Sequence, residues 1–273
     1  MSKDLDRYMH DDVQGIYLLF KNGKRPSILD IYRFTKLYPS ISVSFDPGKE
    51  PAPGLVASGA RPDEEWMTEH DAASWLELLS DGLTFDIIGL APGDYSSFPT
   101  VAHGFDFDRN QINKFEHAIR LNPGAHVSGA EGAIPVLKTL LGLARDLIQH
   151  FEQIEAVVWP PSGSVIGRRF FESTVSAYLE GGAFPALGLI AFQEALDGGL
   201  QSVGLAHIIG QELRIEPDLA SDKVAATRLA VRLINQLILT GTVDRREDLV
   251  SPDGRIIHLE PSGNARFVRV LSK

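Results

Sequence analysis

The sequence predicts an α+β protein with a mixed, largely antiparallel sheet and helices packed on one side of it. Three observations lead to this class. Short apolar runs typical of strands alternate with amphipathic helical patterns along the chain. Charged and apolar residues alternate over 212–216, as in a half-buried strand. Two strand-like runs, 255–260 and 266–271, flank a Pro-Ser-Gly-Asn turn and predict a hairpin. A doubly wound parallel sheet is the alternative.

The first half of the chain has a strand–helix–strand rhythm that gives way to turns. Pro26 marks the start of the first helix, and the many Pro and Gly residues of 46–61 make that segment a candidate linker. The expected elements, in order, are a strand at 16–20, a helix at 27–37, a strand at 41–45, a short helix within 66–80, a strand at 84–90 and a polar loop at 94–109.

The second half is more regular and contains the two longest amphipathic helices. The first of them tolerates Pro135 in its opening turn, and the second has Arg228, Arg232 and Asn235 on its polar side and Gly241 as its stop. The expected elements, in order, are a short helix at 110–121, a strand at 125–128, a helix at 131–151, a strand at 154–159, a helix at 167–179, a strand at 184–192, one or two strands within 200–216, a helix at 221–239 and the hairpin.

These elements fit a single domain over residues 1–273, because helices that each need an apolar surface to cover favour one shared core. Within it we expect two similar αβ halves, approximately 1–110 and 111–273. A chain of 273 residues with 44% hydrophobic residues is sufficient for such a core.

The composition narrows the classes of partner. The formal net charge of −10 argues against general affinity for nucleic acid or for an anionic membrane, since both require a positive surface. We therefore expect another protein as the partner. A basic protein would meet the acidic surface most rapidly, because complementary charge speeds encounter.

The lack of cysteine limits the possible kinds of site, and the first residues indicate the cellular compartment. The absence of cysteine excludes disulfides, thiolate metal sites and thiol nucleophiles. The opening MSKDLDRYMHDDVQ is polar and acidic where a secretory signal is basic and then apolar, and no run has the length of a membrane span. We expect a cytoplasmic protein with no membrane partner, and no motif indicates a cofactor.

One stretch has the layout of an anion site. Residues 157–169, VVWPPSGSVIGRR, predict a strand, a small-residue turn and the N-terminus of a helix, where free N–H groups can face a phosphate. The proline pair removes two N–H donors, and neither the Walker nor the GxGxxG spacing is present. In the simpler interpretation a serine caps the helix and the arginines are solvated. The candidate ligands are Ser162, Gly163, Ser164, Arg168 and Arg169.

A metal site is a weaker hypothesis. His103, Asp106 and Asp108 are close in sequence, and residues two apart in an extended segment point to the same side. No HExxH or EF-hand spacing accompanies them, and loop carboxylates are usually hydrated. We therefore predict no metal.

Catalytic candidates are similarly incomplete. His126 and Ser128 would share one face of a strand at 125–128, but no acidic residue is placed to orient the histidine, and no GxSxG elbow occurs. His207 and Glu212 could form a polar pair, which more often satisfies itself than performs acid–base chemistry.

The second half resembles an uncharacterised family of bacterial proteins known only as a domain of unknown function. The resemblance covers roughly residues 84–260 and implies a compact bacterial domain with several αβ steps. It implies no activity, and it favours protein binding. The runs that carry it are TFDIIGLAPG at 84–93, AHVS at 125–128, AVVW at 156–159, Ser-Gly at 162–163, SVGL at 202–205 and QELRIE at 211–216.

Together these observations predict a non-catalytic bacterial protein-binding domain, of an accessory or immunity type. The acidic surface, the missing catalytic constellation and the family resemblance support this function. The alternative is an enzyme or small-ligand-binding protein with an anion site at 162–169.

Overall fold

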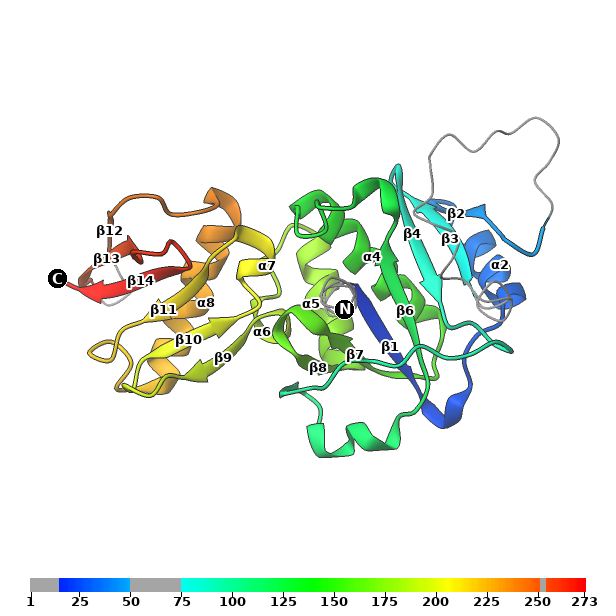
Figure 1. The fold of residues 1–273 in the computed structure, drawn as a ribbon, viewed down its shortest axis with the longest axis horizontal. Helices are drawn as coiled ribbons and strands as arrows, with labels where there is room; N and C mark the ends of the chain where they lie inside the picture. The colour runs from blue at the N-terminus through cyan, green and yellow to red at the C-terminus, as the bar shows by residue number, and fades with distance from the viewer. Residues whose placement is uncertain (1–14, 50–74, 251–253) are drawn as a thin grey trace, which may run out of the picture.

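The chain forms two sheets that lie end to end in an elongated molecule (Figure 1). This computed structural model describes residues 15–49, 75–250 and 254–273. Both sheets are mixed and largely antiparallel, and helices pack on them, so the predicted α+β class is confirmed. No helix of the described residues is long and apolar enough to cross a membrane.

The first sheet has eight strands in the order β2-β3-β4-β6-β1-β7-β8-β5. All its neighbours are antiparallel except β5 and β8, which run parallel. The strands are β1 (Ile16–Phe20), β2 (Ile41–Phe45), β3 (Trp75–Ser80), β4 (Leu83–Ile88), β5 (His103–Phe105), β6 (Ala118–Pro123), β7 (Ile154–Trp159) and β8 (Ser164–Gly167).

Strand β1 is the centre of this sheet and is buried on both faces. Leu18 and Phe20 join the main core under helices α2 (Ile28–Leu37), α4 (Ile134–His150) and α5 (Arg168–Leu179). Tyr17 and Leu19 join a smaller cluster on the opposite face, which apolar side chains of the 94–115 segment cover. Alternation of the side chains along the strand places the two sets on opposite faces.

Local signals determine where the helices begin and end. Ser27 caps α2, because its side chain accepts from the Asp30 N–H while the Asp30 carboxylate accepts from the Ser27 N–H. Pro135 lies in the first turn of α4, where its missing N–H costs nothing. Gly241 ends the last long helix, α8 (Lys223–Thr240).

The second sheet has six strands in the order β12-β13-β14-β11-β10-β9, with α8 on one face. Strands β11 and β14 are parallel, because the chain crosses over through α8 between them. The strands are β9 (Ala191–Glu194), β10 (Leu200–Val203), β11 (Glu212–Ile215), β12 (Glu247–Val250), β13 (Ile256–Pro261) and β14 (Phe267–Ser272).

The two sheets share one hydrophobic core, whose members run from Ile16 to Val270. At their junction the backbones approach closely. A methyl group on Gly204 would lie 2.8 Å from the Ser162 Cβ, and one on Gly132 would lie 1.9 Å from the His207 carbonyl oxygen. The absence of side chains at these two glycines is therefore what lets the sheets meet.

Most expected elements are confirmed, and the differences have physical causes. The predicted helix over 66–80 is wrong for its described part, 75–80, which is β3; Leu76 and Leu78 are buried and alternate with Trp75 and Glu77. The spacing of Trp75, Leu78 and Leu79 also fits a helix, but the alternation of buried and less buried residues over 75–78 is that of a strand. Residues 66–74, and most of the candidate linker, lie outside the described residues.

Three other expected elements are wrong, and the polar loop expected at 94–109 contains the short strand β5. Residues 110–121 form a 3-10 turn, η3 (Arg109–Lys114), and the start of β6, because pairing with β1 and β4 overrides the local helical pattern. Residues 125–128 form a 3-10 turn, η4 (Ala125–Val127), rather than a strand. The strand expected at 184–192 starts only at Ala191, because Gly188, with φ of 101°, turns the chain within the short helix α6 (Ala186–Leu189).

The boundary between the two sheets lies further along the chain than the boundary expected near residue 110. Strands β6, β7 and β8 follow that point but belong to the same sheet as β1. The second sheet begins at Ala191. Residues 111–167 therefore complete the first sheet.

Substitution of Gly204 tests the junction. Gly204→Ala should lower the free energy of unfolding by about 1–3 kcal/mol, because the methyl group meets Ser162 and the φ of 99° disfavours a side chain. Gly198→Ala is the matched control, since Gly198 has φ of 89° but no atom within 4 Å. Urea denaturation of both variants measures the difference, and an equal loss in the two would contradict close packing at Gly204.

Candidate functional site

The predicted anion loop is a β-hairpin turn rather than a strand–turn–helix joint. Residues 160–162 form a 3-10 turn, η5 (Pro160–Ser162), and Gly163, with φ of 59°, reverses the chain into β8. Ser162 and Ser164 are buried and their hydroxyls are joined at 2.8 Å, so neither caps α5. Their hydroxyls are thus turned into the hairpin.

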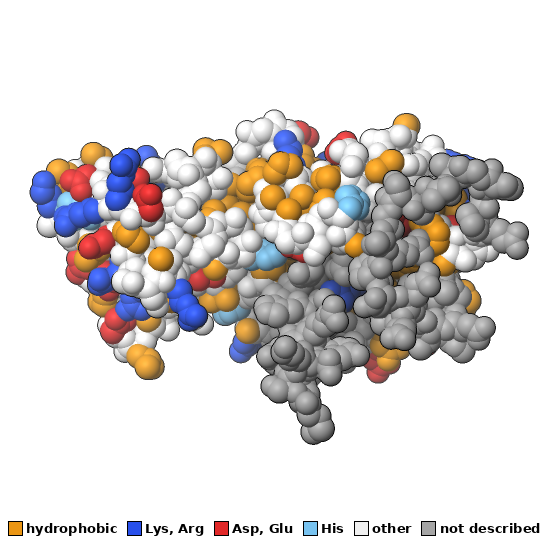
Figure 2. Space-filling view, turned by 45° about the horizontal axis from the view of Figure 1, so that its top comes forward, with side chains coloured by type: hydrophobic (Ala, Val, Ile, Leu, Met, Phe, Trp, Pro, Cys, Tyr) orange, Lys and Arg blue, Asp and Glu red, His pale blue; other side chains and the backbone are white. Residues whose placement is uncertain are grey.

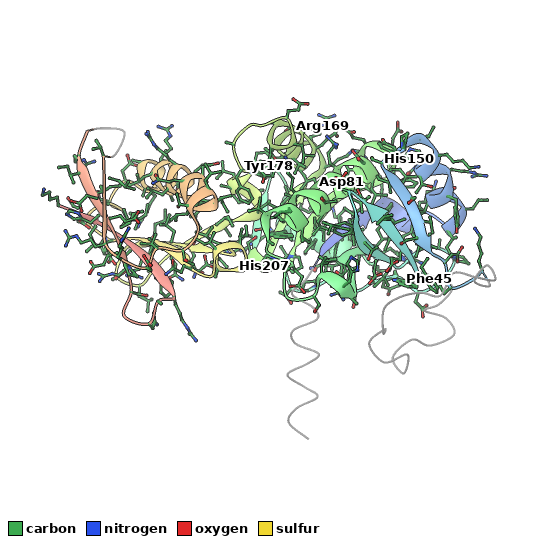
Figure 3. All side chains as sticks on the ribbon, turned by 90° about the horizontal axis from the view of Figure 1, so that it is seen from above. Phe45, Asp81, His150, Arg169, Tyr178 and His207 are labelled. Carbon is green, nitrogen blue, oxygen red and sulfur yellow. The ribbon has the colours of Figure 1, made fainter. Side chains whose placement is uncertain are left out.

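The two arginines of this stretch have different surroundings. Arg168 donates to the carbonyl oxygens of Ile148 at 2.5 Å, Phe151 at 2.9 Å and Ile154 at 3.0 Å. It therefore satisfies the carbonyls of Ile148 and Phe151 at the C-terminal end of α4, where carbonyls have no helical partner, and joins this end to the first residue of β7. Arg169 is exposed on α5, and Figure 3 places it on the opposite side of the molecule from His207.

The three metal candidates do not converge. His103 lies on β5, Asp108 accepts from the Asn110 N–H at 3.0 Å and so caps η3, and the Asp106 backbone packs against Gly167. Burial, and then the charge of Arg109, lower the pKa of His103. Across the described residues no three His, Asp or Glu side chains are grouped as metal ligands.

His126 and Ser128 lie at the exposed η4 turn instead of on one strand face. The Nδ1 atom of His126 is 2.9 Å from the Thr84 hydroxyl, which ties this turn to β4. The expected juxtaposition of a histidine with a serine nucleophile depended on a strand and is absent from this turn.

Glu212 has a structural role. Its carboxylate accepts from the Ser202 hydroxyl at 2.5 Å and from the backbone N–H groups of residues 204, 205 and 206 at 2.8, 3.2 and 3.1 Å. It thus caps the short helix α7 (Ala206–Ile209), whose first N–H groups have no helical acceptor.

His207 belongs to the junction between the sheets. Its ring lies edge-on to Trp159 with centroids 5.6 Å apart. Burial lowers the pKa of His207, while the charge of Glu131 opposes this effect. Burial of the ring thus disfavours its protonated form.

The structure instead draws attention to the face of the six-stranded sheet that points away from α8. We call it the outer face. Leu213, Ile215, Val268 and Val270 point to α8 and the core, so alternation places the residues between them on the outer face. A row of polar side chains crosses five strands there: Gln193, Gln201, Arg214, Arg269 and Glu260.

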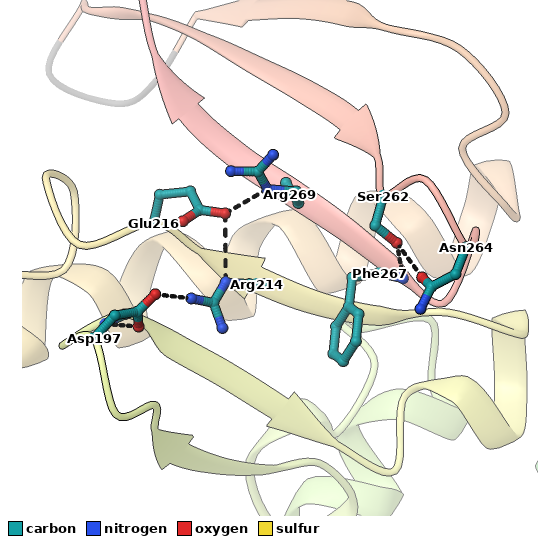
Figure 4. Close-up of polar contacts among 8 residues, drawn as sticks. Asp197, Arg214, Glu216, Ser262, Asn264, Phe267 and Arg269 are labelled. Atoms are coloured by element: carbon teal, nitrogen blue, oxygen red, sulfur yellow. Dashed lines mark hydrogen bonds and ion pairs between the residues drawn. The ribbon is translucent and has the colours of Figure 1, made fainter.

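A charge network holds the centre of this row (Figure 4). Glu216 accepts from Arg269 at 2.6 Å and contacts Arg214 at 3.4 Å, and Arg214 also contacts Asp197. A hydrogen bond from the Gly199 N–H, and then the Arg214 charge, lower the pKa of Asp197. The network therefore fixes two neighbouring guanidinium groups, one of which, Arg269, is 41% exposed.

Apolar side chains flank the network. Phe267 is half-buried and lies two residues before Arg269 on β14, on the same face. Val250 on β12 pairs with Ile256 on β13, and these side chains are 67% and 40% exposed. His258 lies between these groups, and its Nδ1 is 2.6 Å from Asp248. The hydrogen bond with His258 lowers the pKa of Asp248. The face thus combines fixed charges with exposed apolar contacts.

Charge is unevenly distributed in the molecule. Residues 191–273 contain ten Lys and Arg and eleven Asp and Glu, whereas residues 1–190 contain 16 and 25. Figure 2 shows Lys and Arg side chains gathered on the lobe of the six-stranded sheet, with Asp and Glu between them. The outer face is therefore electrically mixed on an otherwise acidic protein.

Sequence reasoning missed this network for a definable reason. The alternation of 212–216 indicates that Arg214 and Glu216 point to the same side of a strand. The pairing of β11 with β14 joins segments more than 50 residues apart, and the contact between Glu216 and Arg269 follows from their parallel register. The alternation in both strands was the available signal.

Comparisons with known proteins add no function. No family model matches the chain, and neither curated proteins nor solved structures show significant similarity to it. Function is therefore inferred from the geometry of the described residues.

Arg168 and Arg169 provide a test of the loop at 162–169. Arg168→Ala should lower the free energy of unfolding by about 2–4 kcal/mol, because three carbonyl groups lose a charged donor. Arg169→Ala, the neighbouring control, should change it by less than about 0.5 kcal/mol. Thermal melts with and without 10 mM phosphate measure both effects. Phosphate stabilisation that is lost with Arg168 would indicate an anion site instead.

His207 should make stability depend on pH. Its pKa in the folded protein is below the unfolded value of 6.5, so the unfolded chain binds more protons between the two values. The stability contribution is present above pH 6.5 and is lost as the pH falls toward the folded pKa. Denaturation midpoints from pH 8 to pH 5 should fall less for His207→Gln than for the native chain, and the range from pH 7.5 to 8 is the internal control. Parallel curves would exclude His207 as a cause.

Proposed function

We propose that this chain is a non-catalytic, cytoplasmic bacterial protein of an accessory or immunity type, and that it binds a partner protein through the outer face. The observation that carries the proposal is the network of Arg214, Glu216 and Arg269, which fixes two guanidinium groups on an open sheet face. Arg214 holds Glu216 and Asp197, and the 41% exposed guanidinium of Arg269 can donate further hydrogen bonds to carboxylates of a partner.

The composition of the outer face supports protein binding. Arginine and aromatic residues contribute a large share of the energy at protein interfaces, and here Arg269 and Phe267 lie two residues apart on β14. The exposed pair Val250 and Ile256 adds apolar area at the edge. Because the charges are mixed, the face favours a partner of mixed charge rather than a uniformly basic one.

The size of the face indicates how a partner must sit. Six strands about 4.8 Å apart and of four to six residues give a patch of roughly 400 Å². A standard interface buries about 800 Å² on each partner. A stable complex therefore has to include surface next to this face, such as the free edge of the outermost strand β12.

The catalytic alternative lacks comparable support. Arg168 is bonded to backbone carbonyls, Glu212 caps α7, and the hydroxyls of Ser162 and Ser164 are buried in a hairpin. These four candidates from the sequence have structural partners, whereas Arg169 is exposed, so the anion-site alternative has less support than the outer face.

Affinity capture with paired variants tests the proposal. Three tagged proteins are compared in extracts of the cells that make the protein. They are the native chain, a face variant with Ile256→Asp and Arg269→Ala, and a control variant with Leu239→Asp at an exposed position of α8. Quantitative mass spectrometry should identify a stoichiometric partner that the face variant loses at least tenfold and the control retains.

Purified partner and variants then give dissociation constants, with thermal melts to verify folding. The face variant should weaken binding by about 2 kcal/mol or more, as expected for loss of central contacts. Retention of the partner by the face variant with equal affinity would refute binding through the outer face.

A further inference from the structure

Helix α2 has an exposed stripe at the end of the molecule opposite the six-stranded sheet (Figure 1). Ile31 and Phe34 point into the core, and Tyr38 packs against it. The residues on the other side of the helix follow at spacings of four, three and one. They are Leu29, Arg33, Lys36 and Leu37, which we call the α2 stripe.

The stripe combines apolar and basic groups. Leu29 is 59% exposed and Leu37 is 67% exposed, which is unusual for two leucines on one face of a helix. They are eight residues apart, about 12 Å along the axis, with Arg33 and Lys36 between them. Lys49 lies beside the stripe, with its Nζ 3.7 Å from the ring centroid of Tyr32 on the same helix, and it is paired with the Asp46 carboxylate at 3.7 Å.

This basic surface contrasts with the rest of the chain. Residues 15–49 contain six Lys and Arg but only two acidic residues, Asp30 and Asp46, whereas the remaining residues contain 20 and 34. Both acidic residues pair with cations of this surface, Asp30 with Arg33 and Asp46 with Lys49, and the segment 15–49 keeps a net charge of +4 from six basic and two acidic residues. Asp30 completes the capping box and pairs with Arg33, and Asp46 accepts from the Tyr32 hydroxyl at 2.8 Å.

We infer that the α2 stripe is a docking site for an acidic amphipathic helix of a second protein partner. Helices pack by setting ridges of side chains into grooves, and the spacing of Leu29, Arg33 and Leu37 forms such a ridge. An apolar side chain of the incoming helix fits between the leucines, and its carboxylates face Arg33 and Lys36.

The charges argue against two other occupants. A symmetric contact with a second copy would place Arg33 and Lys36 of one chain against the same cations of the other, which is repulsive. An anionic membrane would meet a chain of net charge −10, which opposes its approach. An acidic protein helix pairs locally with the stripe and can be directed away from the acidic surface.

The α2 stripe lies far from the outer face. The two surfaces lie at opposite ends of the long axis (Figure 1), so partners bound at both would not compete for space. The chain would then act as a bridge between two proteins.

The test uses a fluorescein-labelled 18-residue synthetic helix of Leu, Glu and Ala, and the same peptide with Lys in place of Glu. Fluorescence anisotropy is measured with the native chain, with Arg33→Glu plus Lys36→Glu, and with Leu29→Ser plus Leu37→Ser. Arg228→Glu plus Arg232→Glu is the matched control, because both residues are exposed on α8. Thermal melts verify that each variant is folded.

We expect saturable binding of the acidic peptide that weakens at least tenfold in both stripe variants, is unchanged in the α8 control and decreases with added salt. Absence of acidic peptide binding, or equal binding of the basic peptide, would overturn the inference. So would a dimer in sedimentation that the Leu29 and Leu37 changes dissolve, or co-sedimentation with phosphatidylserine vesicles in place of peptide binding. The outer-face variant should bind the peptide normally, which separates this result from the proposed function.

Discussion

The close approach of two backbones at the junction of the sheets is the constraint on which the rest of the molecule depends. Gly204 lies against Ser162, and Gly132 lies against the carbonyl oxygen of His207. Because these contacts bring the sheets together, one hydrophobic core extends through both, and the Ser162–Ser164 turn becomes an interior feature. The stretch that most resembles a ligand loop in the sequence is therefore part of the scaffold.

Charged residues that could serve a site likewise have structural roles. Arg168 and Glu212 are two of the candidate site residues in the sequence, and each completes the end of a helix. Charged groups at such ends satisfy several backbone atoms at once, which explains why a polar residue in an apolar neighbourhood need not be functional. Exposed cations lie on open surfaces, among them Arg269 beside Glu216 on the outer face and Arg33 and Lys36 on α2.

Charge is also distributed unevenly along the long axis of the molecule. The two ends carry arginines in different settings, fixed by Glu216 on the outer face and flanked by exposed leucines on α2. Most of the acidic surplus lies elsewhere in the chain. A partner approaching in solution would be oriented by this uneven field before any contact forms, because such fields act over about 10 Å at ordinary ionic strength.

The sequence by itself determined the α+β class, the strands at β1 and β7, the helices α2, α4 and α8, and the C-terminal hairpin, because capping residues and hydrophobic periodicity act locally. Only the tertiary structure decided that 75–80 and 118–123 are strands and that residues 111–167 complete the first sheet, because pairing with distant strands outweighs local preference. It also decided which polar residues are free to act. Glu216 contacts Arg269, which is 53 residues away in the sequence, and a local sequence pattern cannot indicate a contact between such distant residues.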